Sequence, residues 1–268
     1  MTLPAPAPGS TALVTGASSG IGAEIARELA KRGHGVTLVA RREERLRELA
    51  AELSDRLGVR AEAIGADLVD PAGRDALAAR VDELELEVAV LVNNAGFGGG
   101  GKLANADRGY LVRMAQLNCE VVVDLQARYL RGMVDRGSGA VINVASTAAF
   151  QPLPGSAVYA ATKAFMLSLS EAAHAELKGT GVSVTALCPG PVKTEFVQAA
   201  GLDGASENLP GMFWTPVETV AREAVDGAAS GKRVVVPGLM NRAGAITGQH
   251  APRAVALPLV KRFWRRAT

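Results

Sequence analysis

The sequence has little of what several common functional classes require. Only two cysteines, Cys119 and Cys188, occur among 268 residues, and each lies inside a segment of regular hydrophobic patterning. This usage indicates reduced core thiols rather than a disulfide framework. The three histidines lie far apart in the sequence and show no metal-ligand spacing, so we predict no metal site.

Excess charge and long apolar runs are also missing. Lys and Arg number 29 and Asp and Glu number 27, which leaves a net charge of +2. So small an excess, without a basic strip interleaved with aromatic residues, argues against nucleic-acid binding. No uncharged apolar run of about 18 residues indicates a membrane-spanning helix, and the first ten residues lack the pattern of a secretory signal. We therefore expect a cytoplasmic protein.

The remaining composition is that of a globular protein, with 48% hydrophobic and 21% charged residues. Residues 1–10 are rich in Pro and Ala and predict a loose tail. Over residues 11–249, apolar strand-like runs alternate with amphipathic helical segments. This alternation favours a single α/β domain, with a doubly wound, Rossmann-type, mostly parallel sheet in a three-layer α/β/α arrangement. Residues 250–268 form a separate basic tail.

A glycine-rich turn follows the first predicted strand. Residues 11–15 are apolar, GASSGIG follows, and AEIARELAKRG has the pattern of a helix that ends at Gly33. Gly16 permits the tight turn, while Gly20 and Gly22 allow a pyrophosphate to approach the backbone and the helix N-terminus. This order is typical of a nucleotide-binding unit, although the spacing differs from the commoner G-x-G-x-x-G. A glycine turn without a ligand is the alternative.

Two arginines follow the second predicted strand, residues 35–40. NAD-binding units commonly place an acidic residue there, about 20 residues after the glycine turn, to bind the ribose 2′-hydroxyl. Arg41 and Arg42 would instead bind a 2′-phosphate through charge-assisted hydrogen bonds. We therefore predict NADP(H), with Arg41 as the first contact. The alternative is that both arginines only begin the charged helix REERLRELAAEL.

The alternation of strands and helices continues along the chain. Further strands are predicted at 60–67, 88–96, 139–146 and 182–194, and further helices at 71–84 and 106–136. Asp67, at the end of a strand, could accept a hydrogen bond from an adenine amino group, and Gly96 leaves room for a ribose. Ligands of an open parallel sheet bind at the carboxyl ends of its strands. The residues at such ends, which predict one shared site, are Gly16, Asn93, Ser146 and Pro189.

Tyr159 is followed four residues later by Lys163, within the amphipathic helical stretch YAATKAFMLSLSEAAHAEL. Side chains at this spacing are neighbours on a helix, so the ammonium group can lower the pKa of the phenol from about 10. Such a phenol could exchange a proton with an alcohol or carbonyl oxygen near neutral pH. An isolated Y-x-x-x-K also arises from a half-buried Tyr beside a surface Lys, so this inference depends on the rest of the chain.

Six features occur together in one order: TGASSGIG (15–22), NNAG (93–96), Asn118, Ser146, Tyr159-x-x-x-Lys163 and PGPVKT (189–194). Over roughly residues 10–240 the chain resembles the short-chain dehydrogenase/reductase family in its ordinary single-domain form. The resemblance implies an NADP(H)-dependent oxidoreductase that transfers a hydride between the nicotinamide and a carbonyl or secondary alcohol. It also implies a homodimer or homotetramer, paired through residues 106–136 and 156–178.

The resemblance further implies a role for each matched residue. Tyr159 would be the general acid in reduction and the base in oxidation, and Lys163 would lower its pKa and bind the nicotinamide ribose. Ser146 would hydrogen-bond the substrate oxygen. Asn118 would interrupt its helix and hold a water that links Lys163 to solvent. The predicted cofactor contacts, with Val192 and Thr194 at the carboxamide, are Gly16, Ser18, Ser19, Gly20, Ile21, Gly22, Arg41, Arg42, Asp67, Leu68, Asn94, Ala95, Gly96, Tyr159, Lys163, Pro189, Gly190, Val192 and Thr194.

Substrate contacts are expected between residues 148 and 158 and between residues 196 and 214. The second stretch lies in a predicted lid of about residues 191–215 and has apolar ends around a polar, glycine-containing middle. An apolar pocket without an obvious arginine favours a lipophilic ketone, aldehyde or secondary alcohol. The alternative is that these side chains pack at the base of the lid or at a subunit contact. The predicted lining is Ala148, Phe150, Leu153, Phe196, Phe213 and Trp214.

The basic tail, residues 250–268, mixes cationic and aromatic side chains, a pattern that can bind an anionic membrane surface. Pro252 and Pro258 limit its helical length, so we favour a tail that docks on its own domain or on a neighbouring subunit.

A function of a different class stays open, namely a cofactor-binding regulator or scaffold that keeps the fold without turnover. The complete set of Asn118, Ser146, Tyr159 and Lys163 argues against it. A screen of carbonyl compounds monitored by NADPH absorbance separates the two functions.

Overall fold

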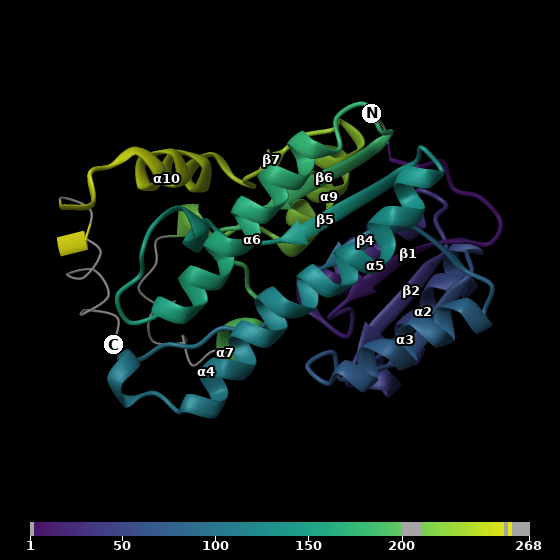
Figure 1. Cartoon of the computed structure of the whole chain (residues 1–268), viewed down its shortest axis with the longest axis horizontal. Helices are drawn as coiled ribbons and strands as arrows, with labels where there is room; N and C mark the ends of the chain where they lie inside the picture. The colour runs from purple at the N-terminus through teal and green to yellow at the C-terminus, as the bar shows by residue number, and fades with distance from the viewer. Residues whose placement is uncertain (1–2, 200–210, 255–256, 259–268) are drawn as a thin grey trace.

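The computed structural model describes residues 3–199, 211–254 and 257–258, and within them seven parallel strands form one sheet between two layers of helices (Figure 1). The strand order is β3-β2-β1-β4-β5-β6-β7. The predicted Rossmann-type sheet is therefore confirmed. The strands are β1 (Ser10–Thr15), β2 (Val36–Ala40), β3 (Ala61–Gly65), β4 (Glu87–Asn93), β5 (Gly139–Val144), β6 (Val182–Leu187) and β7 (Val234–Val235).

The helices connect successive strands and cover both faces of the sheet. They are α1 (Gly20–Lys31), α2 (Glu43–Leu57), α3 (Pro71–Glu83), α4 (Arg108–Ala115), α5 (Val121–Asp135), α6 (Ala157–Glu176), α7 (Glu195–Ala199), α9 (Val217–Ala229) and α10 (Leu239–His250). Shorter helical turns are η1 (Leu103–Asn105), η2 (Gln116–Glu120), η3 (Thr147–Phe150) and η4 (Gly211–Phe213). Figure 1 shows α10 at the edge of the molecule, where Ala245 of this helix packs in a core cluster with Phe150 of η3.

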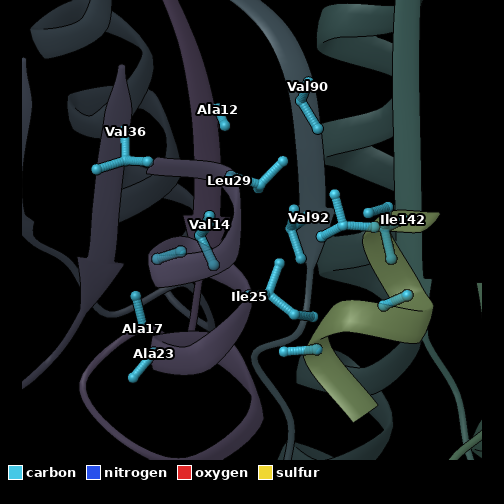
Figure 2. Close-up of a cluster of buried hydrophobic side chains, with 14 of the residues drawn as sticks. Ala12, Val14, Ala17, Ala23, Ile25, Leu29, Val36, Val90, Val92 and Ile142 are labelled. Carbon is cyan, nitrogen blue, oxygen red and sulfur yellow. The ribbon is translucent and has the colours of Figure 1, made fainter. Parts of the chain in front are cut away.

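Neighbouring residues of a central strand face opposite helical layers, as the two-residue repeat of a strand requires. Val14 lies in a core cluster with Ile25 and Leu29 of α1, and Figure 2 shows these side chains near one another at one face of the sheet. Leu13 lies in a second cluster with Leu125 of α5. Because both faces are covered, the strands are continuous apolar runs rather than alternating ones, which is typical of parallel sheets.

The sheet changes direction between β1 and β4, because β2 continues from one side of β1 and β5 from the other side of β4. The loops that follow β1, β4, β5 and β6 all leave the same carboxyl edge. An open parallel sheet holds its ligand at such a switch point. The topology therefore places the candidate site at the ends of β1 and β4.

Among the predicted elements, the long helix and the last strand differ most from the structure. The helix predicted over 106–136 is divided by the π-helical turn η2 into α4 and α5. The strand predicted over 182–194 ends at Leu187, because Pro189 and Pro191 lack the N–H that a continuing ladder requires. β7, which pairs with β6, was not predicted.

The lid and the tail are described only in part, and residues 200–210, 255–256 and 259–268 lie outside the described residues. At the start of the tail, Arg253 Nη1 donates to the carbonyl oxygens of Gly248 at 3.2 Å and Phe150 at 3.5 Å. That portion docks on its own domain. Among the described helices we find none with the length and apolarity to cross a membrane.

A buried amide network connects the middle of the sheet to the helices beside it. Asn143 Oδ1 accepts from Asn93 Nδ2 at 2.9 Å, and Asn143 Nδ2 donates to Gln126 Oε1 at 2.6 Å and to Ser170 Oγ at 2.9 Å. All four side chains are buried. Asn143 is the shared partner, so its loss would leave Asn93 Nδ2 of β4 and Gln126 Oε1 of α5 without a bond among the described residues, whereas Ser170 Oγ keeps its bond to the Met166 carbonyl.

We predict that Asn143→Ala lowers the free energy of unfolding by about 2–4 kcal/mol, because unpaired buried polar groups are costly. Ser183→Ala on neighbouring β6 is the matched control, since the buried Ser183 hydroxyl has no hydrogen-bond partner in the described part of the chain and its removal should change stability little. Urea unfolding followed by circular dichroism measures both. Equal losses in the two variants would contradict the role given to the network.

Candidate active site

A cavity of about 1150 Å³ opens at the carboxyl edge of the sheet. Loops after six of the strands line it, together with side chains of α4, α6 and α10. Gly22 is the one predicted cofactor contact that does not line the cavity. The predicted contacts that line it are Gly16, Ser18, Ser19, Gly20, Ile21, Arg41, Arg42, Asp67, Leu68, Asn94, Ala95, Gly96, Tyr159, Lys163, Pro189, Gly190, Val192 and Thr194.

The glycine turn is held against the end of β4. Thr15 Oγ1 accepts from the backbone N–H groups of Asn94 at 3.0 Å and Ala95 at 2.9 Å, while Asn94 Nδ2 donates to the carbonyl oxygens of Thr15 at 2.9 Å and Gly16 at 3.2 Å. Gly16 has a φ of +66°, and a Cβ there would lie 2.7 Å from Asn94 Nδ2. Gly22 packs directly on the same Asn94 amide and on the Gly16 carbonyl. The turn therefore requires glycine for both conformation and space.

Arg42 is the arginine that the structure places against the glycine turn. Its Nη2 donates to Ser18 Oγ at 3.0 Å and to Ser19 Oγ at 2.9 Å, and its Nη1 pairs with Glu195 at 2.7 Å. Arg41 also lines the cavity and is exposed. The structure thus brings both predicted arginines to the cavity and fixes Arg42 most closely to the turn.

A buried arginine supports the loop after β3, where an adenine was predicted to bind. Asp67 Oδ1 accepts from the Val69 backbone N–H at 3.1 Å, which turns the loop back on itself. Arg74 of α3 donates to the Leu68 carbonyl at 2.8 Å and pairs with Glu120 at 2.8 Å and with Asp124. Sequence reasoning missed Arg74, because an arginine in a polar helix carries no signal of burial.

Ser146, Tyr159 and Lys163 all line the cavity. Ser146 follows β5 and begins η3, where its Oγ accepts from the Ala148 backbone N–H at 3.1 Å. Tyr159 and Lys163 lie on α6. Lys163 is 4% exposed, donates to the Val144 carbonyl at 2.7 Å, and lies 5.8 Å from the centroid of the Tyr159 ring.

The pKa values of this group differ from the sequence expectation. Burial raises the pKa of Tyr159 to about 12, while a hydrogen bond from Ser146 opposes that shift. Burial lowers the pKa of Lys163 to about 8. Contrary to the prediction, the net shift of the Tyr159 pKa is upward, because desolvation of the phenolate dominates it. The Lys163 ammonium group bonds the Val144 carbonyl instead.

Asn118 lies fully buried in the π-helical turn η2, so the predicted interruption of its helix is confirmed. Its Nδ2 donates to the Phe97 carbonyl and to Thr162 Oγ1, both at 3.0 Å, and its Oδ1 accepts from the Phe97 N–H at 3.2 Å. These bonds tie the loop after β4 to α6. The role of Asn118 in a water relay stays a prediction.

The predicted substrate residues divide into two groups. Ala148, Leu153, Phe196, Phe213 and Trp214 line the cavity. Phe150 does not, because its side chain packs in the core cluster with Met166 and Leu167 below η3. The reason is the helical turn η3, which directs alternate apolar residues of TAAF inward and which the sequence pattern did not predict.

Several residues that line the cavity carried no recognisable signal in the sequence. Tyr110 and Arg113 reach it from α4, and Tyr110 OH donates to the Gly98 carbonyl at 2.5 Å. Met240, Asn241 and Ala245 of α10 and Gln151 also line it. These residues belong to no motif, so only the folding of distant segments brings them together. The expectation of a pocket without arginine was wrong, since Arg113 lines the same cavity.

Metal binding has no structural support within residues 3–199, 211–254 and 257–258, where no cluster of three or more His, Cys, Asp or Glu side chains could hold an ion. Cys119 and Cys188 are free thiols. Burial raises the pKa of Cys188 to about 12, so this thiol is protonated at neutral pH.

Known proteins resemble this chain in sequence and in structure. The family described as short chain dehydrogenase matches residues 10–203. Sulfoacetaldehyde reductase 2 of Chromohalobacter salexigens is 37% identical over 201 residues, which are 74% of this chain and 79% of that protein.

Two solved structures share most of the fold. A short-chain dehydrogenase from Sphingobium yanoikuyae in complex with NADPH has a TM-score of 0.79 and 36% identity, covering 96% of this chain and 95% of its own. The bulky-bulky ketone specific alcohol dehydrogenase from Comamonas testosteroni has a TM-score of 0.74 and 30% identity, covering 95% of this chain and 93% of its own. With its glycine turn, its Ser–Tyr–Lys group and the family match over residues 10–203, the chain belongs to the short-chain dehydrogenase family.

Proposed function

We propose that this protein is an NADP(H)-dependent oxidoreductase that interconverts a carbonyl group and a secondary alcohol. The observation that carries the proposal is one continuous cavity that joins the glycine turn and its arginines to Ser146, Tyr159 and Lys163. A related dehydrogenase binds NADPH, and family relatives are named as reductases and alcohol dehydrogenases. A binding regulator without turnover would not need the three polar side chains to converge.

The shape and charge of the cavity fit a phosphorylated dinucleotide. Gly16 and Gly20 of the turn line the cavity, where a pyrophosphate can approach the backbone and the N-terminus of α1. Arg41 and Arg42 supply guanidinium groups for a 2′-phosphate. Asp67 and Leu68 border the adenine end. When bound, the nicotinamide would donate or accept the hydride.

Tyr159 is the proposed proton donor in reduction. With a pKa of about 12 its phenol holds its proton at neutral pH, which is the form that protonates a carbonyl oxygen as it becomes an alkoxide. Ser146 is placed to donate a second hydrogen bond to that oxygen and to stabilise its developing charge. The pKa of Lys163, about 8, lets it gain and lose a proton near neutral pH and so resupply the site.

We propose a lipophilic substrate, because the described lining near Tyr159 is mostly apolar. The rings of Tyr159 and Phe196 lie 5.8 Å apart, and Leu153, Phe213 and Trp214 line the same cavity. The names of the relatives indicate different kinds of substrate, since one is named as a reductase of sulfoacetaldehyde and another as specific for bulky ketones. The apolar lining favours the second kind of substrate.

We also propose a cytoplasmic homodimer or homotetramer. Apolar side chains on the helices expected to pair stay exposed in the single chain, namely Val112 on α4, Val123 on α5 and Phe165 on α6. Burying such side chains against a second copy would favour association.

Tyr159→Phe should lower kcat for carbonyl reduction by about 10²–10⁴-fold, since the variant loses its proton donor. NADPH oxidation followed at a fixed excess of a lipophilic ketone measures this. Tyr129→Phe is the control, because the buried Tyr129 hydroxyl has no hydrogen-bond partner among the described residues and Tyr129 packs against a core cluster outside the cavity lining. Normal turnover by Tyr159→Phe would end the assignment.

Lys163→Met should change how stability depends on pH. The pKa of Lys163 is about 8 in the folded chain against 10.5 ordinarily, so burying the ammonium destabilises the wild type below pH 8. That penalty disappears as pH rises from 8 to 10.5, and the wild type should gain stability relative to the variant over this range. Urea unfolding at several pH values tests it. A stability difference independent of pH would contradict the buried charge.

A further inference from the structure

Glu195, the first residue of α7, connects the start of the lid to the nucleotide end of the cavity. Its Oε2 lies 2.7 Å from Arg42 Nη1, and its Oε1 lies 2.7 Å from Arg45 Nη1. Arg42 directly precedes α2, and Arg45 lies in its first turn. One carboxylate therefore bridges two arginines from a segment 150 residues away in the sequence.

The same Arg42 is the group best placed to receive a 2′-phosphate. Its Nε donates to Ser18 Oγ at 3.2 Å, and its Nη2 donates to Ser18 and Ser19. Both serines belong to the glycine turn and line the cavity. The guanidinium group thus lies between the nucleotide site on one side and Glu195 on the other.

A phosphate dianion and the Glu195 carboxylate would compete for Arg42 at this position. Both are acceptors for Arg42, and two anions held near one cation repel each other. The two arginines lower the pKa of Glu195 to about 2, so the carboxylate stays charged at any working pH. The side chains of Glu195, Arg42 and Arg45 are 49%, 46% and 47% exposed. Solvent therefore weakens the repulsion between the two anions.

Arg45 is a second ion-pair partner for Glu195. Both residues line a smaller cavity of about 490 Å³, beside the main one and bordered also by Arg27 and Lys193. After leaving Arg42, the carboxylate would therefore still have a cation at hand. When the phosphate replaces Glu195 on Arg42, the Glu195 carboxylate can therefore stay paired with Arg45.

We propose that Glu195 competes with the 2′-phosphate of NADP(H) for Arg42, and so determines how strongly the enzyme prefers NADP(H) over NAD(H). The inference rests on the proposed dinucleotide site. NAD(H) has no 2′-phosphate and leaves the Glu195–Arg42 pair intact. The residue therefore weakens binding of one cofactor and leaves binding of the other unchanged.

Isothermal titration with adenosine 2′,5′-bisphosphate and with adenosine 5′-diphosphate tests the competition without turnover, because only the first carries a 2′-phosphate. Glu195→Gln should bind the bisphosphate about 3- to 5-fold more tightly than the wild type, as expected for exposed charges, and bind the diphosphate equally well. Glu48→Gln is the matched control, since the exposed Glu48 lines the smaller cavity without a hydrogen bond to Arg42. It should bind both nucleotides as the wild type does.

Unchanged or weaker binding of the bisphosphate by Glu195→Gln would overturn the competition, and weaker binding would show instead that Glu195 organises Arg42 for the phosphate. A wild type that binds the bisphosphate, with no difference between variants, would leave the proposed function standing. A wild type that binds neither nucleotide would reject the dinucleotide site and the competition together. Circular dichroism of each variant confirms that the fold is retained.

Discussion

The structure depends on the junction between the glycine turn and the end of β4. Thr15 and Asn94 exchange hydrogen bonds across this junction through both side chains and backbone. The bonds fix the turn at the point where the sheet changes direction, next to the N-terminus of α1, where a phosphate can bind. Gly22 has to be glycine for the same reason, since it packs on the Asn94 amide. One set of contacts therefore holds the glycine turn against the switch point of the sheet.

A second set of contacts connects this junction to Tyr159 and Lys163. Asn118 bonds the backbone of Phe97, just after the Asn94 loop, and the side chain of Thr162 on α6. Tyr159 and Lys163 lie on that same helix, so their positions are tied to the end of β4. The π-helical turn at Asn118 directs its amide inward, away from the path of a regular helix. The π-helical turn thus connects the loop after β4, at the cofactor side of the site, to the helix that carries Tyr159 and Lys163.

Burial, rather than the neighbouring ammonium group, sets the protonation states in this pair. The phenol is kept neutral and the Lys163 pKa is brought near the working range. Solvent reaches the nucleotide end of the cavity, where the half-exposed side chains of Arg42, Arg45 and Glu195 form ion pairs. The cavity therefore joins a desolvated end suited to proton transfer with a solvated end suited to recognising phosphate.

The sequence by itself determined the fold class, the glycine turn and the candidate group of Ser146, Tyr159 and Lys163, because each has a local signature in period, spacing or residue type. Periodicity also placed most strands and helices, but it could not detect the π-helical turn, whose pattern is that of a continuous helix. Tertiary structure decided what depends on distant partners. It buried Phe150 in the core, brought Arg113 and α10 to the cavity, buried Arg74 beneath the Leu68 loop, and paired Glu195 with Arg42. Nothing local marks these side chains, since their surroundings come from segments far away in the chain.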